Sequence, residues 1–229
     1  MALLLGGVVA LAGCAEEGQG QAASRRNAVL LVDCSGSTAA FRSTWIPEVI
    51  GATAQALNRR QLVWIDCIDG SPLATARFVL RLDGRNIPSA YEGNEVLADE
   101  FNRARAASLR PKLEQLFAGT RRARGSGILD GLEAAGGLRP AQVVLWTDGL
   151  VIQAENRIDL NKPLSPASER GIVDTWAPRL AGLRGAQVTI VGVGTGAHSA
   201  LSARQVRRLF PELLSKAGAN VELSPAFVS

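Results

Sequence analysis

The stretch Ala28-Val29-Leu30-Leu31-Val32-Asp33-Cys34-Ser35-Gly36-Ser37 joins an apolar run to a short series of oxygen-bearing side chains. An uninterrupted apolar run of this length is typical of a strand that is covered on both faces, as in a parallel sheet. Asp33, Ser35 and Ser37 follow on the loop that leaves this strand. Closely spaced carboxylate and hydroxyl oxygens suit a hard cation such as Mg²⁺, so the stretch predicts a metal site at the end of a buried strand.

Apolar runs of this kind recur along the chain and alternate with segments that favour helices. We expect strands at residues 28–33, 61–67, 75–82, 142–147, 187–194 and 220–223, and helices at 44–57, 95–116, 127–135, 167–183 and 203–217. Residues 75–82 are mixed in polarity and suit an edge strand, and residues 150–166 suit a long loop. This alternation predicts an α/β fold with a doubly wound, mostly parallel six-stranded sheet, one antiparallel edge strand, and helices on both faces.

Local signals mark the ends of several predicted helices. Pro111 should break or kink the helix at 95–116, because proline lacks the amide hydrogen that the helix needs. Ser126 and Ser202 are the expected N-caps of the two helices that follow them. Gly218 suits the end of the last helix.

A second acid follows another apolar strand, in the run Val143-Val144-Leu145-Trp146-Thr147-Asp148-Gly149. In a doubly wound sheet, ligands bind beyond the carboxyl ends of the strands, at the point where the direction of the connections reverses. If the two strands are neighbours at that point, Asp33 and Asp148 face one crevice. Ser35 and Ser37 are two residues apart on the adjoining loop, so their hydroxyls can point the same way.

Taken together, these motifs resemble those of the von Willebrand factor type A (vWA) domain over residues 26–225. The resemblance rests on Asp-x-Ser-x-Ser after the first strand, Thr147-Asp148-Gly149 after a later strand, and Val191-Gly192-Val193-Gly194, in the expected order. It implies a Rossmann-like vWA fold with a metal-ion-dependent adhesion site (MIDAS). Such a site binds Mg²⁺, and Mn²⁺ is the alternative ion.

The resemblance implies a metal site made of two strand-end acids, two serines of the first loop and one further hydroxyl: Asp33, Ser35, Ser37, Asp148 and Ser126. The serines would ligate the ion through their hydroxyl oxygens, and the acids would hold it directly or through water. The family usually has a threonine at the fifth position. Ser126 matches the position but not the residue, and Thr120 is the alternative.

An Mg²⁺ ion held in this way stays electrophilic and keeps an open coordination position. The resemblance implies that this position takes an Asp or Glu carboxylate of a partner protein. The chain is then an adhesion, scaffold or assembly module and not an enzyme. Two alternatives stay open, which are a Mg²⁺-dependent phosphatase-like enzyme that uses Asp33, and a structural vWA domain whose metal site is empty.

Other function classes find little support in the sequence. The net charge of +4 comes from scattered arginines without interleaved aromatic residues, which disfavours nucleic acid as a partner. The only histidine is His198, and Ser35 is not in a Gly-x-Ser-x-Gly motif, which disfavours a serine hydrolase. No P-loop and no Cys/His cluster for zinc is present in the sequence.

The first residues predict an exported protein. Residues 1–13 are apolar but too short to span a bilayer, and Leu11-Ala12-Gly13-Cys14 resembles the bacterial lipobox, in which the signal is cut before a lipidated cysteine. We expect a lipoprotein signal peptide at 1–13, lipidated Cys14 with a flexible tether at 14–25, the vWA-like domain at 26–225 and a tail at 226–229. The protein would be lipid-anchored in the bacterial cell envelope, on its periplasmic or extracellular face. The basic segment expected before the apolar run is missing, and an N-terminal helix of a soluble protein is the alternative.

The two remaining cysteines each stand at the end of a predicted strand. Cys34 and Cys67 are an even pair, and such a pair can oxidise in an exported protein. We expect a disulfide between them, provided that the two strands are neighbours. The alternative is two buried free thiols.

Overall fold

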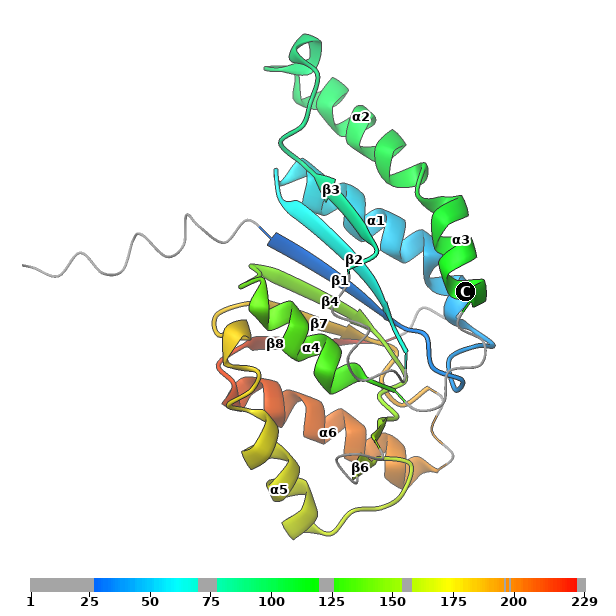
Figure 1. Ribbon diagram of the computed structural model, residues 1–229, viewed down its shortest axis with the longest axis vertical. Helices are drawn as coiled ribbons and strands as arrows, with labels where there is room; N and C mark the ends of the chain where they lie inside the picture. The colour runs from blue at the N-terminus through cyan, green and yellow to red at the C-terminus, as the bar shows by residue number, and fades with distance from the viewer. Residues whose placement is uncertain are drawn as a thin grey trace, which may run out of the picture.

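The computed structural model describes residues 27–69, 78–119, 126–153, 158–195, 197 and 199–225. Within these ranges the chain forms one six-stranded sheet with the order β3-β2-β1-β4-β7-β8 (Figure 1). All neighbouring pairs are parallel except β2 and β3, which are antiparallel at one edge. The strands are β1 (Asn27–Asp33), β2 (Leu62–Ile68), β3 (Leu80–Asp83), β4 (Gln142–Trp146), β7 (Gln187–Val191) and β8 (Asn220–Ser224). The predicted fold class is therefore confirmed.

Helices cover both faces of the sheet (Figure 1). The six α-helices are α1 (Ile46–Asn58), α2 (Glu95–Ala107), α3 (Arg110–Gly119), α4 (Ile128–Gly137), α5 (Pro166–Trp176) and α6 (Ala200–Lys216) among the described residues. Short 3₁₀ turns form η1 (Arg42–Trp45), η2 (Ser89–Tyr91) and η3 (Ala181–Leu183). Helices α1 and α3 cover one face, with α2 packed against α1, and α4, α5 and α6 cover the other.

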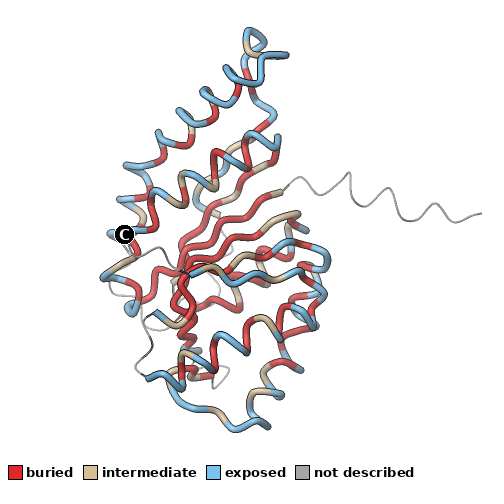
Figure 2. The backbone as a smooth tube through the Cα atoms, turned by 180° about the vertical axis from the view of Figure 1, so that it is seen from behind, coloured by how far each residue is buried: buried red, intermediate tan, exposed pale blue. Residues whose placement is uncertain are grey.

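The side chains of β1 show how the sequence builds this sandwich. Ala28, Leu30 and Val32 pack in one buried cluster with residues of α1 and α3. Val29 and Leu31, which point to the opposite face, pack in a second cluster with α4, α5 and α6. Because successive side chains of a strand alternate between faces, a strand with two covered faces must be apolar throughout. Figure 2 shows this buried centre running along the strands.

The structure corrects several predicted element boundaries. The predicted loop at 150–166 contains a small two-stranded sheet, in which β5 (Ile152–Gln153) pairs with β6 (Ile158–Asp159). The predicted strand at 75–82 is described only from residue 78, and β3 begins at Leu80. The helix predicted at 95–116 is two helices, and the break lies at Ser108 and Leu109. Pro111 is the second residue of α3, where its missing amide hydrogen removes no helical hydrogen bond.

The two predicted serine caps are wrong. Helix α4 has Gly127 at its N-cap position, with no side-chain hydrogen bond, so Ser126 lies one residue outside. The N-cap of α6 is Ser199, whose hydroxyl accepts a hydrogen bond from the amide of Ser202. The prediction for Gly218 is confirmed. Its φ of 88° and the hydrogen bond from the Ala219 amide to the Leu214 carbonyl end α6 in a Schellman motif.

The predicted signal peptide at 1–13, the lipidated Cys14 with its tether at 14–25, and the tail at 226–229 lie outside the described residues. Among the residues that are described, none of the helices combines the length and apolar character needed to cross a bilayer.

Candidate metal centre

Asp33 and Asp148 lie where the connections of the sheet change direction. The chain moves from β1 to β2 on one side of β1 and later returns to place β4 on its other side. Strands β1 and β4 are parallel neighbours, with Val32 opposite Trp146. Asp33 is the last residue of β1, and Asp148 follows β4 by two residues. The structure therefore places both acids at the topological switch point, at the carboxyl edge of the sheet.

Asp33 is fully buried and both of its carboxyl oxygens accept hydrogen bonds. Oδ1 accepts from the Ser35 amide at 2.9 Å, and Oδ2 accepts from the Thr147 hydroxyl at 2.7 Å. Burial, and after it the nearby charge of Asp148, raise the pKa of Asp33 from 3.8 to about 6. Thr147 thus links the ends of β1 and β4.

Ser35 and Ser37 point their hydroxyls toward each other, with 3.0 Å between the two Oγ atoms. Ser35 is buried, whereas Ser37 is exposed. Ser35 therefore lies below the surface of the candidate site, and Ser37 lies at the surface. An ion bound between these two residues would sit at the edge of the sheet.

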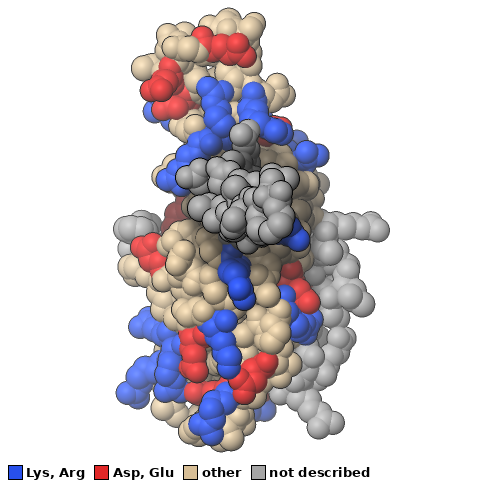
Figure 3. Space-filling view, turned by 90° about the vertical axis from the view of Figure 1, so that its left-hand side faces the viewer, with Lys and Arg blue, Asp and Glu red and all other residues tan. Residues whose placement is uncertain are grey.

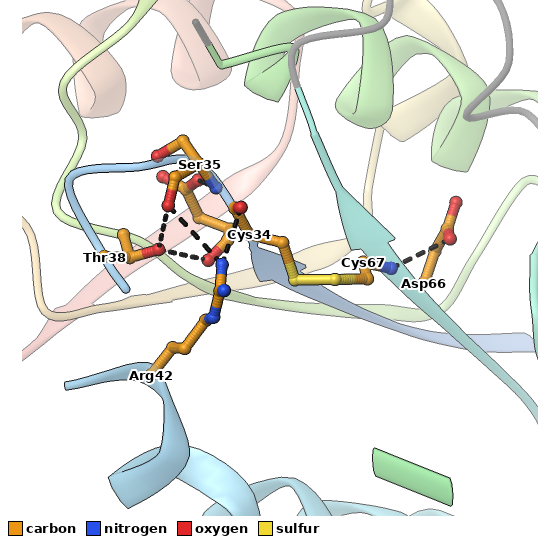
Figure 4. Close-up of a disulfide and its surroundings, with 7 residues drawn as sticks. Cys34, Ser35, Thr38, Arg42, Asp66 and Cys67 are labelled. Atoms are coloured by element: carbon orange, nitrogen blue, oxygen red, sulfur yellow. Dashed lines mark hydrogen bonds between the residues drawn. A yellow bond between two sulfur atoms is a disulfide. The ribbon is translucent and has the colours of Figure 1, made fainter. Parts of the chain in front are cut away.

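Two residues that sequence reasoning missed hold this loop in shape (Figure 4). The buried Thr38 donates its hydroxyl hydrogen to the carbonyls of Asp33, at 2.7 Å, and Ser35, at 3.1 Å. The buried Arg42 guanidinium donates to the Cys34 carbonyl at 2.6 Å. No local pattern distinguishes this arginine from the exposed ones, because its role depends on where η1 packs.

Cys34 and Cys67 form a disulfide, which confirms the predicted pair (Figure 4). Their Cα atoms are 5.6 Å apart, within the usual range for a disulfide. The Cys34 amide also donates to the Ile68 carbonyl at 2.7 Å. The middle of the Asp33–Ser37 loop is therefore tied to the end of β2 by one covalent bond and one hydrogen bond.

The segment after β4 is fixed by glycines and by Asp148 itself. The Asp148 Oδ1 accepts from the Leu150 amide at 2.9 Å, across Gly149, whose φ is 78°. The amide of Gly194, with a φ of 85°, donates to the Asp148 carbonyl at 2.7 Å. Gly149 and Gly194 thus allow the loops after β4 and β7 to meet.

Ser126 lies between the end of β2 and the segment after β4. Its amide donates to the Ile152 carbonyl, and the neighbouring Gly127 amide donates to the Asp69 carbonyl. Ser126 is 1% exposed, and its Oγ has no hydrogen-bond partner among the described residues. A buried hydroxyl without a partner is costly, so this atom is available to a ligand. Thr120, the alternative fifth ligand, lies outside the described residues.

The chemistry of these groups fits a hard cation bound mainly by neutral oxygens. The described part of the chain contains no group of three His, Cys, Asp or Glu side chains that could hold a metal ion. The candidate site has two carboxylates, and its other donors are hydroxyls, which suits Mg²⁺ with retained water better than Zn²⁺. Ser126 makes no hydrogen bond to the other four residues, so its assignment to the candidate site rests on its position and on its unpartnered oxygen.

Comparisons with known proteins return distant structural similarity. No protein-family model and no curated protein matches the chain. A mutant of the PilB minor pilin from Streptococcus sanguinis is 13% identical with a TM-score of 0.47, over 88% of this chain and 57% of the pilin chain. The human COPII-coat protein Sec24c is 14% identical with a TM-score of 0.46, over 89% of this chain and 30% of Sec24c. The chain thus spans only part of the length of each of these proteins.

Proposed function

We propose that this protein is a vWA-like module that binds Mg²⁺ at Asp33, Ser35, Ser37, Ser126 and Asp148 and then binds a carboxylate of a partner protein. The lipid on Cys14 would hold the module in the bacterial cell envelope. Its role would be adhesion, scaffolding or assembly, without catalysis.

The observations that carry the proposal are the buried Ser126 hydroxyl, which lacks a hydrogen-bond partner among the described residues, and two buried acids at the ends of neighbouring strands. Asp33 and Asp148 are both buried, and the negative charge of Asp148 disfavours ionisation of Asp33. A divalent cation at this edge would relieve that repulsion and would give the Ser126 oxygen a ligand to bind.

The geometry of Asp33 favours this proposal over a phosphatase-like enzyme. A nucleophilic carboxylate needs an oxygen that is free to attack the substrate. Both oxygens of Asp33 accept hydrogen bonds, and the side chain has no exposed surface. If the protein nevertheless hydrolysed a generic phosphate ester with Mg²⁺, and Asp33→Asn abolished the activity, the binding-module proposal would be wrong.

Calorimetric titration with Mg²⁺ and Mn²⁺ tests the metal site. We expect binding to the wild-type protein and at least a tenfold loss of affinity in Ser35→Ala, which removes the buried hydroxyl of the loop. Ser43→Ala is the matched control, because Ser43 is an exposed serine of η1 close by in the sequence. Absence of binding to the wild type would instead support a structural domain with an empty site.

Affinity purification from envelope extracts, with and without EDTA, tests the partner. Proteins that bind through the metal should be retained in Mg²⁺ and released by EDTA, and they should be lost with Ser35→Ala but not with Ser43→Ala. Candidates should then lose binding when a single exposed Asp or Glu is replaced. A partner that is retained equally in EDTA contradicts the proposed mode of binding.

A further inference from the structure

The two ends of the parallel strands differ in their charged residues. At the amino end, Asp83 lies opposite Leu62 and is paired with Arg85 at 2.6 Å. Asp33, Asp69 and Asp148 stand at the carboxyl ends of β1, β2 and β4, within one or two residues of each strand. The loops that lead into β2, β4 and β7 contain arginine and no acid, namely Arg59, Arg60, Arg139 and Arg184. Since parallel strands all begin at the same edge, the topology gathers these four residues, which we call the arginine edge. Two more arginines, Arg25 and Arg26, directly precede β1 in the sequence.

The four side chains of the arginine edge are exposed. The Arg59 guanidinium donates a hydrogen bond of 3.2 Å to the side chain of Gln142, the first residue of β4. Because β1 lies between β2 and β4, the Arg59 side chain extends across the start of β1. The Arg184 side chain packs closely against Gly218. A Cβ atom added at Gly218 would lie 3.1 Å from the Arg184 Cγ atom. Figure 3 looks onto this side of the molecule and shows Lys and Arg side chains above and below the residues drawn in grey, with Asp and Glu side chains interspersed.

The backbone at two of these positions favours glycine, not arginine. Arg60 has a φ of 59° and Arg139 a φ of 47°, and they are the non-glycine residues with positive φ in the described chain. A side chain in this left-handed region is unfavourable, so glycine commonly stands there after a helix. Favourable contact with the negative end of a helix contributes to the choice of arginine after α1 and α4.

We propose that the arginine edge docks on an anionic phospholipid surface. The expected orientation of the domain on the membrane rests on the proposed function, in which lipidated Cys14 anchors the chain. Strand β1 starts at this edge, so the segment from Cys14 reaches the domain there, and thirteen residues can span at most about 45 Å. Docking would turn the candidate metal centre, at the opposite edge of the sheet, away from the membrane toward a partner.

The expected strength follows from the charge of the lipid surface. Each basic side chain close to such a surface strengthens binding by about fivefold at moderate salt, so two of them contribute about 30-fold. Because the interaction is electrostatic, it should weaken steeply as the salt concentration rises.

Sedimentation with lipid vesicles tests the proposal. The full chain carrying Cys14→Ser, which cannot be lipidated, is mixed in EDTA with vesicles of phosphatidylcholine alone or with a third of phosphatidylglycerol. The readout is the ratio of the two partition coefficients, in which any contribution of the apolar residues 3–13 cancels. The result depends neither on metal binding nor on lipid attachment, so its failure would be separate from a failure of the proposed function.

The edge variant Arg60→Gln/Arg139→Gln should reduce this ratio by about 30-fold, with an unchanged circular dichroism spectrum. The matched control is Arg170→Gln/Arg204→Gln, which removes two exposed arginines from the first halves of α5 and α6 and should change the ratio less than twofold. Equal losses in both variants, or no preference for anionic vesicles, would overturn the proposal. So would an edge variant that loses affinity for duplex DNA while keeping its preference for anionic vesicles.

Discussion

At the scale of single residues, the candidate metal centre depends on polar side chains that the core has buried. Asp33, Thr38 and Arg42 are each almost inaccessible, and each has a hydrogen-bond partner in the loop or at the end of a neighbouring strand. Such groups are tolerated in the interior because hydrogen bonds replace lost water. The Ser126 hydroxyl, by contrast, has no hydrogen-bond partner among the described residues, and this has a measurable consequence.

Replacing Ser126 by Ala should leave folding stability nearly unchanged and should weaken metal binding. In EDTA we expect the free energy of unfolding to change by less than about 1 kcal/mol, because the hydroxyl has no described hydrogen-bond partner to lose. In Mg²⁺ the melting temperature of the wild type should rise while that of the variant stays nearly constant. Thermal unfolding in both conditions measures this. Ser126→Thr keeps a hydroxyl and serves as the control.

Asp66 should make the protein less stable as the pH rises. It is buried in β2, and its Oδ1 accepts the Cys67 amide at 2.8 Å. Burial raises its pKa from 3.8 to about 7. Between these values the folded state keeps a proton that the unfolded chain releases, so stability falls as the pH rises through this window and is constant above it.

Asp66→Asn has no group that titrates here, so it should remove about 2–4 kcal/mol of this pH-dependent loss of stability. Its amide oxygen can still accept the hydrogen bond from the Cys67 amide. Urea unfolding midpoints at several pH values between 4 and 8, in EDTA, measure the slope. Asp33 contributes a loss of the same sign over a narrower pH range, because its pKa is raised to about 6, and this part should persist. Asp99→Asn, at an exposed position of α2, should leave the slope unchanged, and an unchanged slope in Asp66→Asn would contradict the assignment.

At the scale of elements, the loop after β1 is held by its neighbour β2. The disulfide joins residues 33 positions apart, and Arg42 from η1 supports the same loop from the other side. If this loop presents Ser35 and Ser37 to an ion, as proposed, such fixation reduces the conformational entropy that is lost on binding.

Removing the disulfide should therefore affect stability and metal affinity together. Cys34→Ala/Cys67→Ala should lower the free energy of unfolding by about 3–4 kcal/mol, as expected for a loop of this length. The affinity for Mg²⁺ should fall as well. Denaturant unfolding and calorimetry measure the two effects. Dithiothreitol should bring the wild type to the same midpoint and leave the double variant unchanged, whereas equal stability of both proteins would show that the bond contributes nothing.

At the scale of the whole molecule, the fold separates two edges of one sheet. The carboxyl edge holds the candidate metal centre, and the amino edge holds the arginine edge and the start of β1. A parallel sheet has this polarity because every strand and every covering helix of its βαβ units runs in a fixed direction. A tether at one edge therefore leaves the opposite edge accessible to a partner.

Cys14 tests the attachment of the whole molecule. We expect the wild-type protein to fractionate with membranes and to carry the mass of a lipid chain on a protein that begins at residue 14. Cys14→Ser should remain uncleaved or become soluble. Cell fractionation and mass spectrometry measure both properties. A wild-type protein that is soluble and without lipid would show that the anchor is wrong.

The sequence was sufficient to predict the sheet and its strand-end acids. Continuous apolar runs such as 28–32 and 143–146 have one favourable environment, which is a strand covered on both faces. The right-handed connections between such strands leave few topologies, so the positions of Asp33 and Asp148 at one edge follow from the pattern. Cys34 and Cys67 were predicted as a pair for the same reason, since each stands at the end of such a strand.

Tertiary structure alone decided the contacts that complete the site. Thr147 meets Asp33 across two strands, Arg42 is buried where η1 packs, and Ser126 lies outside the helix that it was expected to cap. The pairing of β5 with β6 was likewise absent from the pattern, since two-residue strands have no periodicity. The pattern of apolar and polar residues reflects the average environment of a segment. A hydrogen bond between residues distant in the sequence depends instead on how whole helices and strands pack. The sequence therefore determined which edge of the sheet carries the acids, and packing determined which oxygens face one another there.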